Sequence, residues 1–254
     1  MGRGVQGREG LRAAGGILLS FCMIVILLIS SVEFVCYNFP GYFQREYIKH
    51  DVLKDLPGME MQGEGGLLAL TDHMMEYLRG NEQVSDLQFD VSVDGTSRPF
   101  FSERELKHME DVRNLFIGGQ RLRIAAVAIA ALLLIFMRKF LFSTDRAFVR
   151  SLLESLLRGI KLFGALVVML GLVCAVQFQT AFVAFHHLFF RNDLWLLDPA
   201  KDWLIRLLPQ SFFFDTAAAI LVTFVICLLL IAAFCRWQLR EFKRNDKETQ
   251  GDAA

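Results

Sequence analysis

An uncharged run of 24 residues, Leu162–Phe185, is the feature that most constrains this chain. It is bracketed by Lys161 and His186. At ~1.5 Å rise per residue, a helix of this length crosses the ~30 Å hydrocarbon core of a bilayer. Two further uncharged runs of 20 residues, Ala13–Val32 and Thr216–Cys235, are also long enough to span. The sequence therefore predicts at least three transmembrane helices.

A shorter run, Ile124–Met137, is uncharged for only 14 residues. Arg123 and Arg138 at its ends can reach toward the headgroups and extend its usable length. A fourth crossing also places the basic segments of the chain on one side of the membrane. The composition agrees, since 54% hydrophobic residues and a mean hydropathy of +0.40 are typical of a membrane protein with sizeable polar parts. The net charge of zero suggests no nucleic-acid partner.

Residues 38–120 are polar and read as a folded cap. Apolar residues at helical spacing predict a helix over Leu67–Leu78, stopped by Gly80. Alternating residues around Asp94-Gly95 predict a β-hairpin over 85–101. Ser102-Glu-Arg-Glu105 is a capping box that opens a helix over Glu103–Phe116. The predicted fold is thus an α-helical integral membrane protein with four transmembrane helices and a small α+β extracytoplasmic cap.

Charge predicts the orientation. The N-terminus, the loop after the second helix and the tail hold 14 basic and 7 acidic residues, whereas the rest holds 13 basic and 20 acidic ones. The basic side is expected to be cytoplasmic. The tail, which is polar, is expected to be disordered. The predicted segments are 1–37 (N-terminus and helix 1), 38–120 (cap), 121–142 (helix 2), 143–160 (cytoplasmic loop), 161–186 (helix 3), 187–214 (outer interfacial loop), 215–236 (helix 4) and 237–254 (cytoplasmic tail).

All five histidines fall on the predicted outer side: His50, His73, His108, His186 and His187. We interpret His50 and His73 as solvated surface residues. His108 has Asp111 one turn away, and a carboxylate there can fix its tautomer and raise its basicity. His186 and His187 lie at the outer end of the third helix, where ionisable groups are costly unless functional.

Several chemistries remain open for such a site. The outer segments contain no nucleophile elbow, HExxH or phosphate-binding loop, so a histidine site suits proton transfer at an unperturbed pKa of ~6.5. The same histidines could bind zinc, with Asp111 or Asp193 as third ligand, in a membrane hydrolase. A non-enzymatic membrane sensor or binding protein that uses the histidines as a pH switch is the third possibility.

Three blocks of sequence resemble a bacterial family of four-helix integral membrane proteins, the lipoprotein intramolecular transacylases. They are Phe100–Phe116 with its His-Met-Glu-Asp-Val core, then Phe185-His-x-x-Phe-Phe190 with Trp195 and Asp198, and then Leu204-Ile-x-x-Leu-Pro209 with Phe213. The resemblance covers essentially the whole chain.

The resemblance implies an acyltransferase that moves the sn-2 acyl chain of a diacylglyceryl lipoprotein to its own N-terminal cysteine amine. It maps the two catalytic histidines onto His108 and His186, and we assign Asp111, Arg113, His187 and Trp195 as supporting residues. No cofactor or metal is expected. The expected partners are a diacylated bacterial lipoprotein and membrane lipid. The expected form is a monomeric, multi-pass protein of the bacterial cell membrane, with both termini cytoplasmic.

Overall fold

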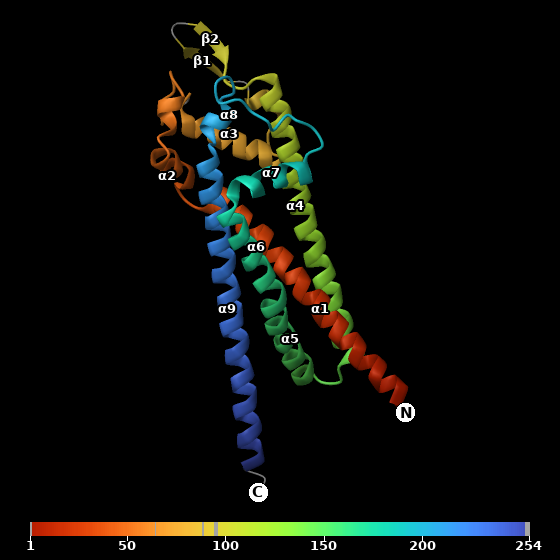
Figure 1. Ribbon diagram of the computed structural model, residues 1–254. Helices are drawn as coiled ribbons and strands as arrows, with labels where there is room; N and C mark the ends of the chain where they lie inside the picture. Colours follow the sequence, from red (N-terminus) through yellow and green to blue (C-terminus); the bar gives the residue numbers. More distant parts are fainter. Residues whose placement is uncertain (1, 64, 88, 94–95, 252–254) are drawn as a thin grey trace. The chain divides into compact units, whose positions relative to one another are not determined.

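The computed structural model describes residues 2–63, 65–87, 89–93 and 96–251, and helices dominate them (Figure 1). Four helical segments are long and apolar enough to cross a membrane: Gly7–Asn38, Glu103–Leu141, Asp145–Val176 and Gln210–Lys247. The described residues also form a two-stranded antiparallel sheet. This confirms the predicted fold class, four spans with a small α+β part.

The α-helices in chain order are α1 (Gly2–Glu33), α2 (Tyr42–Lys49), α3 (Leu67–Arg79), α4 (Glu103–Phe136), α5 (Asp145–Gly159), α6 (Ala165–Val176), α7 (Phe178–Phe189), α8 (Leu204–Leu207) and α9 (Gln210–Gly251). Short π- or 3₁₀-helical turns are η1 (Phe34–Asn38), η2 (Val52–Asp55), η3 (Val84–Leu87), η4 (Met137–Leu141) and η5 (Ile160–Gly164). The strands are β1 (Asp90–Val93) and β2 (Thr96–Pro99).

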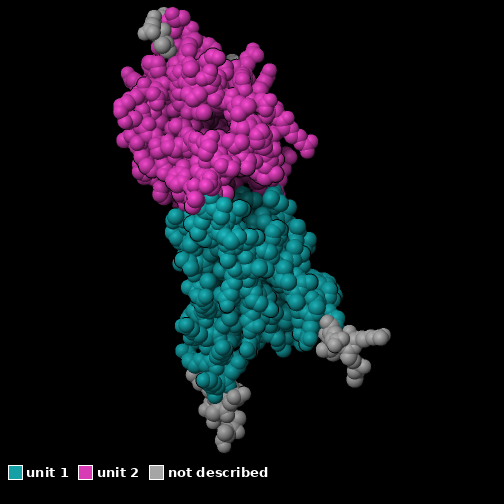
Figure 2. Space-filling view, viewed as in Figure 1, with its two compact units in different colours: residues 1–31, 122–173, 221–254 teal, residues 32–121, 174–220 magenta. Residues whose placement is uncertain are grey.

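The chain divides into two compact units (Figure 2). Unit 1 comprises residues 1–31, 122–173 and 221–254, and therefore most of the apolar helical sequence. Unit 2 comprises residues 32–121 and 174–220. It holds the predicted cap together with the segment that carries His186.

Unit 1 packs through small residues where α1 meets α5. The Ser20 Oγ lies 2.9 Å from the Ser155 carbonyl oxygen. A Cβ added at Gly16 would collide with the Ser155 side chain, and one added at Gly159 would collide with the Ser20 side chain. Small residues at i and i+4 let two helix backbones approach closely inside a membrane. This crossing is therefore tight because it lacks large side chains.

Unit 2 has an apolar core to which the predicted cap elements contribute together with Trp203, Leu204, Leu207 and Phe212. The predicted helix at 67–78 is confirmed as α3, and Gly80 ends it in the left-handed conformation at φ 96°. The predicted hairpin is confirmed as β1 and β2, with Val91 opposite Arg98. Its turn, Asp94-Gly95, lies outside the described residues. The predicted helix at 103–116 joins the predicted second span in the single helix α4.

Two sequence-based expectations were wrong. The third span does not run unbroken through the uncharged stretch: α6 ends at Val176, and α7 begins after Gln177, whose ψ is 48°. The membrane-length helix instead begins at Asp145 and includes residues 145–160, most of the predicted cytoplasmic loop 143–160. Apolar residues at helical spacing in that loop, such as Phe148, Leu152 and Leu156, predict a short amphipathic helix, and α5 confirms it. Counting only charges overlooked the polar residues Gln177 and Gln179 within the run.

The tail after Cys235 was expected to be disordered, but α9 continues to Gly251. Its residues are mostly good helix formers, so polarity alone was a poor guide. The Phe242 carbonyl and the Asp246 carboxylate both accept hydrogen bonds from Arg146, which holds this part of α9 within unit 1.

Candidate active site

His108 is placed by the capped start of α4. The Ser102 N–H donates to Glu105 Oε2 at 2.7 Å, and the Glu105 N–H donates to Ser102 Oγ at 3.3 Å, which is the reciprocal pairing of the predicted capping box. Glu105 is only 1% exposed, and its Oε1 accepts a hydrogen bond from the Leu204 N–H at 2.6 Å. His108 follows one turn later and is 6% exposed. The capping box thus fixes the turn from which this imidazole projects.

His186 lies near the end of α7 and is 8% exposed. Its Nδ1 is 2.7 Å from the carbonyl oxygen of Phe182, one helical turn earlier. Because a carbonyl only accepts hydrogen bonds, Nδ1 carries the proton when the ring is neutral. The Nε2 atom then keeps its lone pair and can accept a proton from another molecule.

The two imidazoles face the same space. Their ring centroids are 6.1 Å apart, and their planes meet at 33°. One reacting group placed between rings at this separation can lie within ~3 Å of a nitrogen on each. The structure therefore brings His108 and His186, which are 78 positions apart in sequence, into one site.

Aromatic side chains surround the pair. Phe190 packs against both rings, with centroid distances of 5.3 Å to His108 and 5.5 Å to His186. The rings of Phe182 and Trp195 lie 4.3 Å and 4.8 Å from His186. His187 is exposed and lies edge-on to Trp195 at 5.1 Å. Of the two adjacent histidines, His186 is therefore the one within the aromatic site.

Burial controls the charge of the pair. Both histidines belong to unit 2. His108 lies in the polar first turns of α4, well before the uncharged run Ile124–Met137, and His186 lies beyond Val176, where the third candidate span ends. Burial is the main cause that lowers the pKa of His108 to about 4; the charge of a protonated His186 contributes to this shift, and Asp111 opposes it. Burial also lowers the pKa of His186, although the hydrogen bond to Phe182 opposes this. Both rings are therefore neutral near pH 7, so each can accept a proton at one nitrogen and donate from the other.

The loop after α7 is tied to the first turns of α4. Arg104 donates to the carbonyl oxygens of Asp193 at 2.6 Å and Leu196 at 2.8 Å. Asp111 accepts a hydrogen bond from the Asn192 side chain at 2.8 Å. Since this loop carries Trp195, the same helix that carries His108 also positions the ring that packs on His186.

Two supporting residues behave differently from expectation. Asp111 binds Asn192, and the buried Nδ1 of His108 has no hydrogen-bond partner, so no hydrogen bond to Asp111 fixes the His108 tautomer at that atom. Arg113 is a residue of α4, and its side chain packs against the end of α3, with its guanidinium 4.8 Å from the Tyr77 ring centroid and 3.4 Å from the Glu82 carbonyl oxygen. The structure places Arg113 in the packing of unit 2 and not beside the histidine pair.

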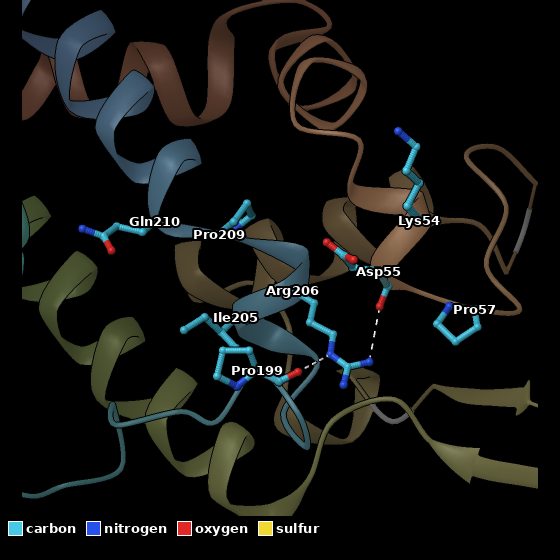
Figure 3. Close-up of a pocket in the computed structure, with 8 residues that line it drawn as sticks. All are labelled: Lys54, Asp55, Pro57, Pro199, Ile205, Arg206, Pro209 and Gln210. Carbon is cyan, nitrogen blue, oxygen red and sulfur yellow. Dashed lines mark hydrogen bonds between the residues drawn. The ribbon is translucent and has the colours of Figure 1, made fainter.

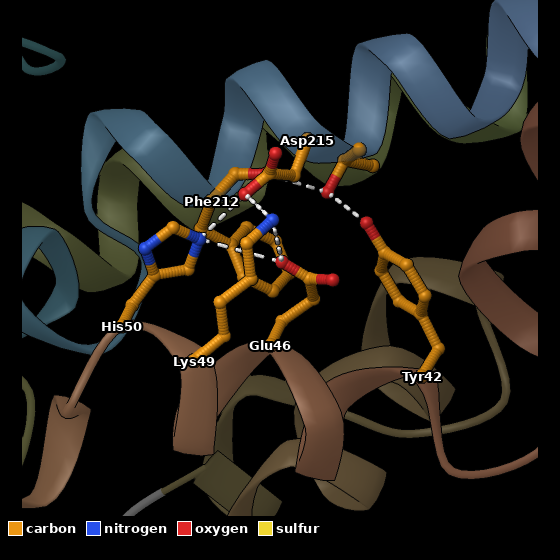
Figure 4. A network of polar contacts seen from close by, with 7 residues as sticks. Tyr42, Glu46, Lys49, His50, Phe212 and Asp215 are labelled. Carbon is orange, nitrogen blue, oxygen red and sulfur yellow. Dashed lines mark hydrogen bonds and ion pairs between the residues drawn. The ribbon is translucent and has the colours of Figure 1, made fainter.

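The remaining histidines pair with carboxylates. His73 Nδ1 lies 3.0 Å from Glu82 on the surface. His50 was expected to be solvated, but its side chain is only 14% exposed and its Nε2 lies 2.7 Å from Asp215 (Figure 4). The expectation was wrong because its partner is distant in sequence.

An open pocket of about 740 Å³ lies elsewhere in unit 2 (Figure 3). Its lining residues are Lys54, Asp55, Pro57, Pro199, Ile205, Arg206, Pro209 and Gln210. Of these, Arg206 donates hydrogen bonds to the carbonyl oxygens of Pro199 at 2.5 Å and Asp55 at 3.4 Å. Neither His108 nor His186 lines this pocket, so its size alone does not identify the reaction site.

The zinc alternative lacks a ligand set at the pair. Among the described residues, the group of three side chains close enough to hold a metal ion is Glu46, His50 and Asp215, which does not include His108 or His186. The arrangement at the pair, two neutral imidazoles within an aromatic enclosure, suits proton transfer to and from an apolar substrate.

Sequence reasoning missed three features of the site. The capping box gave Glu105 as a helix cap, but its bond to Leu204 depends on tertiary structure. No local sequence pattern pointed to Asn192 as a site residue, because its hydrogen-bond partner, Asp111, is 81 positions away. Phe190 could have been found, since it ends the His-x-x-Phe-Phe block that also carries His186.

Comparisons with known proteins bear on the family and the fold of the chain. A family described as lipoprotein intramolecular transacylase Lit matches residues 17–213. The membrane-integral Lit from Bacillus cereus has a similar structure, with a TM-score of 0.66 and 21% identity over 93% of this chain and 99% of that chain. A variant of that protein with histidine replaced by arginine gives a TM-score of 0.67 and 22% identity, over 97% of this chain and 100% of that chain. No curated protein sequence matches the chain.

Proposed function

Because this chain belongs to the Lit family of lipoprotein intramolecular transacylases, we propose that it moves the sn-2 acyl chain of a diacylglyceryl lipoprotein to the α-amine of the same molecule's N-terminal cysteine. The chain is an integral membrane acyltransferase. The observation that supports this particular acyl transfer is the buried pair His108 and His186, whose ring centroids are 6.1 Å apart. The product is a lyso-form lipoprotein with an N-acylated cysteine.

In the first step, the neutral cysteine amine attacks the sn-2 ester carbonyl carbon. A C–N bond forms, the carbonyl oxygen becomes an oxyanion, and the amine nitrogen must lose a proton. His186 accepts that proton at Nε2, because its Nδ1 already donates to the Phe182 carbonyl oxygen. The substrate supplies the nucleophile, so no side chain has to act as one.

In the second step, the intermediate breaks its bond to the glyceryl oxygen. The leaving oxygen takes a proton, and the amide carbonyl re-forms. His108 is neutral near pH 7 because burial lowers its pKa to about 4, so it offers an N–H to the oxyanion or to the leaving oxygen. The proton held by protonated His186 returns to the leaving oxygen, which restores both rings.

Proximity provides much of the rate. The ester and the amine belong to one molecule, and holding them in contact can contribute ~7–11 kcal/mol to lowering the barrier. Converting an ester to an amide is favourable, so the proposed reaction needs no ATP, metal or cofactor. Phe182, Phe190 and Trp195 around the pair provide an apolar environment suited to an acyl chain.

The proposed partners are a diacylated lipoprotein and membrane lipid, with the protein acting as a monomer. We place unit 2 on the extracytoplasmic side and both termini in the cytoplasm, because the N-terminus, residues 138–161 and the tail hold 14 basic and 7 acidic residues.

The reaction can be tested with the purified full-length chain and a synthetic diacylglyceryl lipopeptide. Product and substrate have the same mass, so tandem mass spectrometry must follow the acyl chain from the glyceryl fragment to the cysteine fragment. We expect His108→Ala and His186→Ala each to lower the rate by ~10²–10⁴-fold, the usual contribution of a general acid or base.

Two controls separate this reaction from its alternatives. A substrate with an acetylated cysteine amine should yield no product, whereas a hydrolase would still release fatty acid from it. His73→Ala should retain full activity, because His73 pairs with Glu82 away from the pair. Full activity in both histidine variants would overturn the proposed site.

A further inference from the structure

A second cluster of ionisable groups lies in unit 2, where α2 meets the first turns of α9 (Figure 4). Glu46 and His50 are four residues apart, one at the end of α2 and one just after it, and Asp215 lies on α9. His50 Nε2 is 3.3 Å from Glu46 Oε2 and 2.7 Å from Asp215 Oδ2. One ligand atom from each of the three side chains falls within 4.8 Å of the others.

The spacing of these atoms resembles that of a metal site. Ligand bonds to zinc are ~2.0–2.2 Å, so two ligands at a tetrahedral angle lie ~3.4 Å apart. The Glu46–His50 separation of 3.3 Å already matches this value. The Asp215–His50 separation of 2.7 Å is a hydrogen bond, and a small rotation of the Asp215 carboxylate would lengthen it.

The charges of the cluster are incompletely balanced. Lys49 is the cation at the cluster, with its Nζ 2.7 Å from Asp215 and 3.9 Å from Glu46. Glu46 Oε2 is buried and accepts no hydrogen bond. The two carboxylates of Glu46 and Asp215 therefore share one ammonium, that of Lys49. The Lys49 side chain is 54% exposed, so it can withdraw into water when another cation takes its place.

We propose that Glu46, His50 and Asp215 form a binding site for a divalent transition-metal ion, which displaces Lys49. One imidazole and two carboxylates suit Zn²⁺ better than Ca²⁺ or Mg²⁺, which prefer oxygen ligands. Three protein ligands leave the fourth position of zinc to water. The site is separate from the His108–His186 pair and does not depend on the proposed reaction.

A metal here would fasten α2 to the start of α9. The neighbouring Phe212 already packs against Phe43 and Tyr47 of α2, with centroid distances of 5.7 Å and 6.1 Å. The next residue, Phe213, lies 5.6 Å from Phe182, which packs on His186. Metal binding would therefore stabilise the turn of α9 that supports one wall of the active site.

The test is a Zn²⁺ titration of the full-length, untagged protein in detergent after treatment with a chelator. We expect one saturable site by calorimetry and a metal-dependent rise in the unfolding temperature. His50→Ala and Asp215→Asn should each weaken binding by roughly 10- to 100-fold or more, since even groups that only support ligands contribute that much. His73→Ala, which lies outside the cluster, should bind as the wild type does.

Lys49→Met is the decisive variant because it keeps every ligand and removes the competing ammonium. The proposal requires it to bind Zn²⁺ more tightly than the wild type, whereas a purely structural ion-pair cluster gives no such gain. Absence of saturable binding, unchanged binding in both His50→Ala and Asp215→Asn, or weaker binding in Lys49→Met would each overturn the proposal.

Discussion

At the scale of single residues, Trp195 covers one face of the His186 ring. The two planes meet at only 30°, with centroids 4.8 Å apart. The face of an indole attracts a cation, and this attraction reaches ~2 kcal/mol where water is excluded. Trp195 therefore favours the protonated His186 that forms during the proposed reaction. It partly offsets the burial that lowers the pKa of His186.

We expect Trp195→Leu to lower the pKa of His186 further, because the indole face no longer stabilises the protonated ring. Trp195→Phe should have a smaller effect because a phenyl face remains. Isotope-labelled histidine NMR can follow the pKa, alongside turnover. Trp237→Leu is the matched control because Trp237 is 55% exposed in unit 1. An unchanged pKa in Trp195→Leu would contradict this role.

The histidine pair also predicts the pH dependence of the reaction. The substrate α-amine, with a pKa of ~7.7–8.0, must be neutral to attack. Histidines with ordinary pKa values would titrate near 6.5 and steepen the fall in kcat/KM below that pH. Because burial lowers the pKa of both, to about 4 for His108, log kcat/KM should fall with a slope of one from about pH 7.5 to 6. A slope approaching two or more near pH 6 would argue against neutral histidines.

The same shifts affect stability. His108 binds a proton more readily when the chain is unfolded, since its pKa is about 4 in the folded protein against 6.5 otherwise. The free energy of unfolding should therefore decrease as the pH falls from 6.5 toward 4. His108→Gln, which cannot titrate, should make this decrease smaller in thermal unfolding measured across that range.

At the scale of elements, Glu105 joins the start of α4 to the start of α8. It accepts hydrogen bonds from the N–H groups of Ser102 and Leu204 while only 1% exposed. Glu105→Ala breaks the capping box and leaves the buried Leu204 N–H without its acceptor, which costs ~1–3 kcal/mol. Thermal unfolding should show that the free energy of unfolding falls by about this amount. Glu103→Ala is the control, because Glu103 lies in the same turn but is exposed, and it should leave the free energy of unfolding almost unchanged.

The tight crossing of α1 and α5 predicts that the same substitution, glycine to alanine, has opposite effects on the unfolding temperature inside and outside the crossing. Replacing glycine by alanine inside an exposed helix stabilises it by up to ~1 kcal/mol. Gly118 has no atom within 4 Å of its added Cβ, so Gly118→Ala should raise the unfolding temperature. At Gly159 the added Cβ would collide with Ser20, so Gly159→Ala should lower it. Equal effects at the two positions would show that the crossing is not tight.

Elements encoded by local sequence were predictable. The Ser102–Glu105 box and the Gly80 stop each act within one turn, and the structure contains both. Interactions between distant segments were not predictable, because no local pattern links His50 to Asp215 or Asp111 to Asn192. Charge counting located four spans but missed the break at Gln177. The predicted topology put His108 and His186 on the same side of the membrane, and the family resemblance assigned the two of them as catalytic residues.

At the scale of the whole molecule, most of the apolar helical sequence belongs to unit 1, whereas every residue of the proposed site belongs to unit 2. Charge asymmetry predicts which side of the membrane that unit occupies. Single cysteines at Lys54, in the cap, and at Arg150, in the basic segment, can test this in a cysteine-free background. A membrane-impermeant thiol reagent added to intact cells should label the Lys54→Cys variant only. Labelling of Arg150→Cys alone would invert the orientation.

The bond between the His186 ring and the Phe182 carbonyl has a genetic consequence. Every side chain at position 182 leaves that oxygen in place, because the acceptor belongs to the main chain. A mutational screen would therefore not detect this hydrogen bond, because any effect of replacing Phe182 would come from the loss of its ring contact with His186 and not from the loss of the acceptor. The helical backbone of α7 therefore sets the orientation of the His186 ring. Only changes that disrupt this backbone, such as a proline, would remove the hydrogen bond.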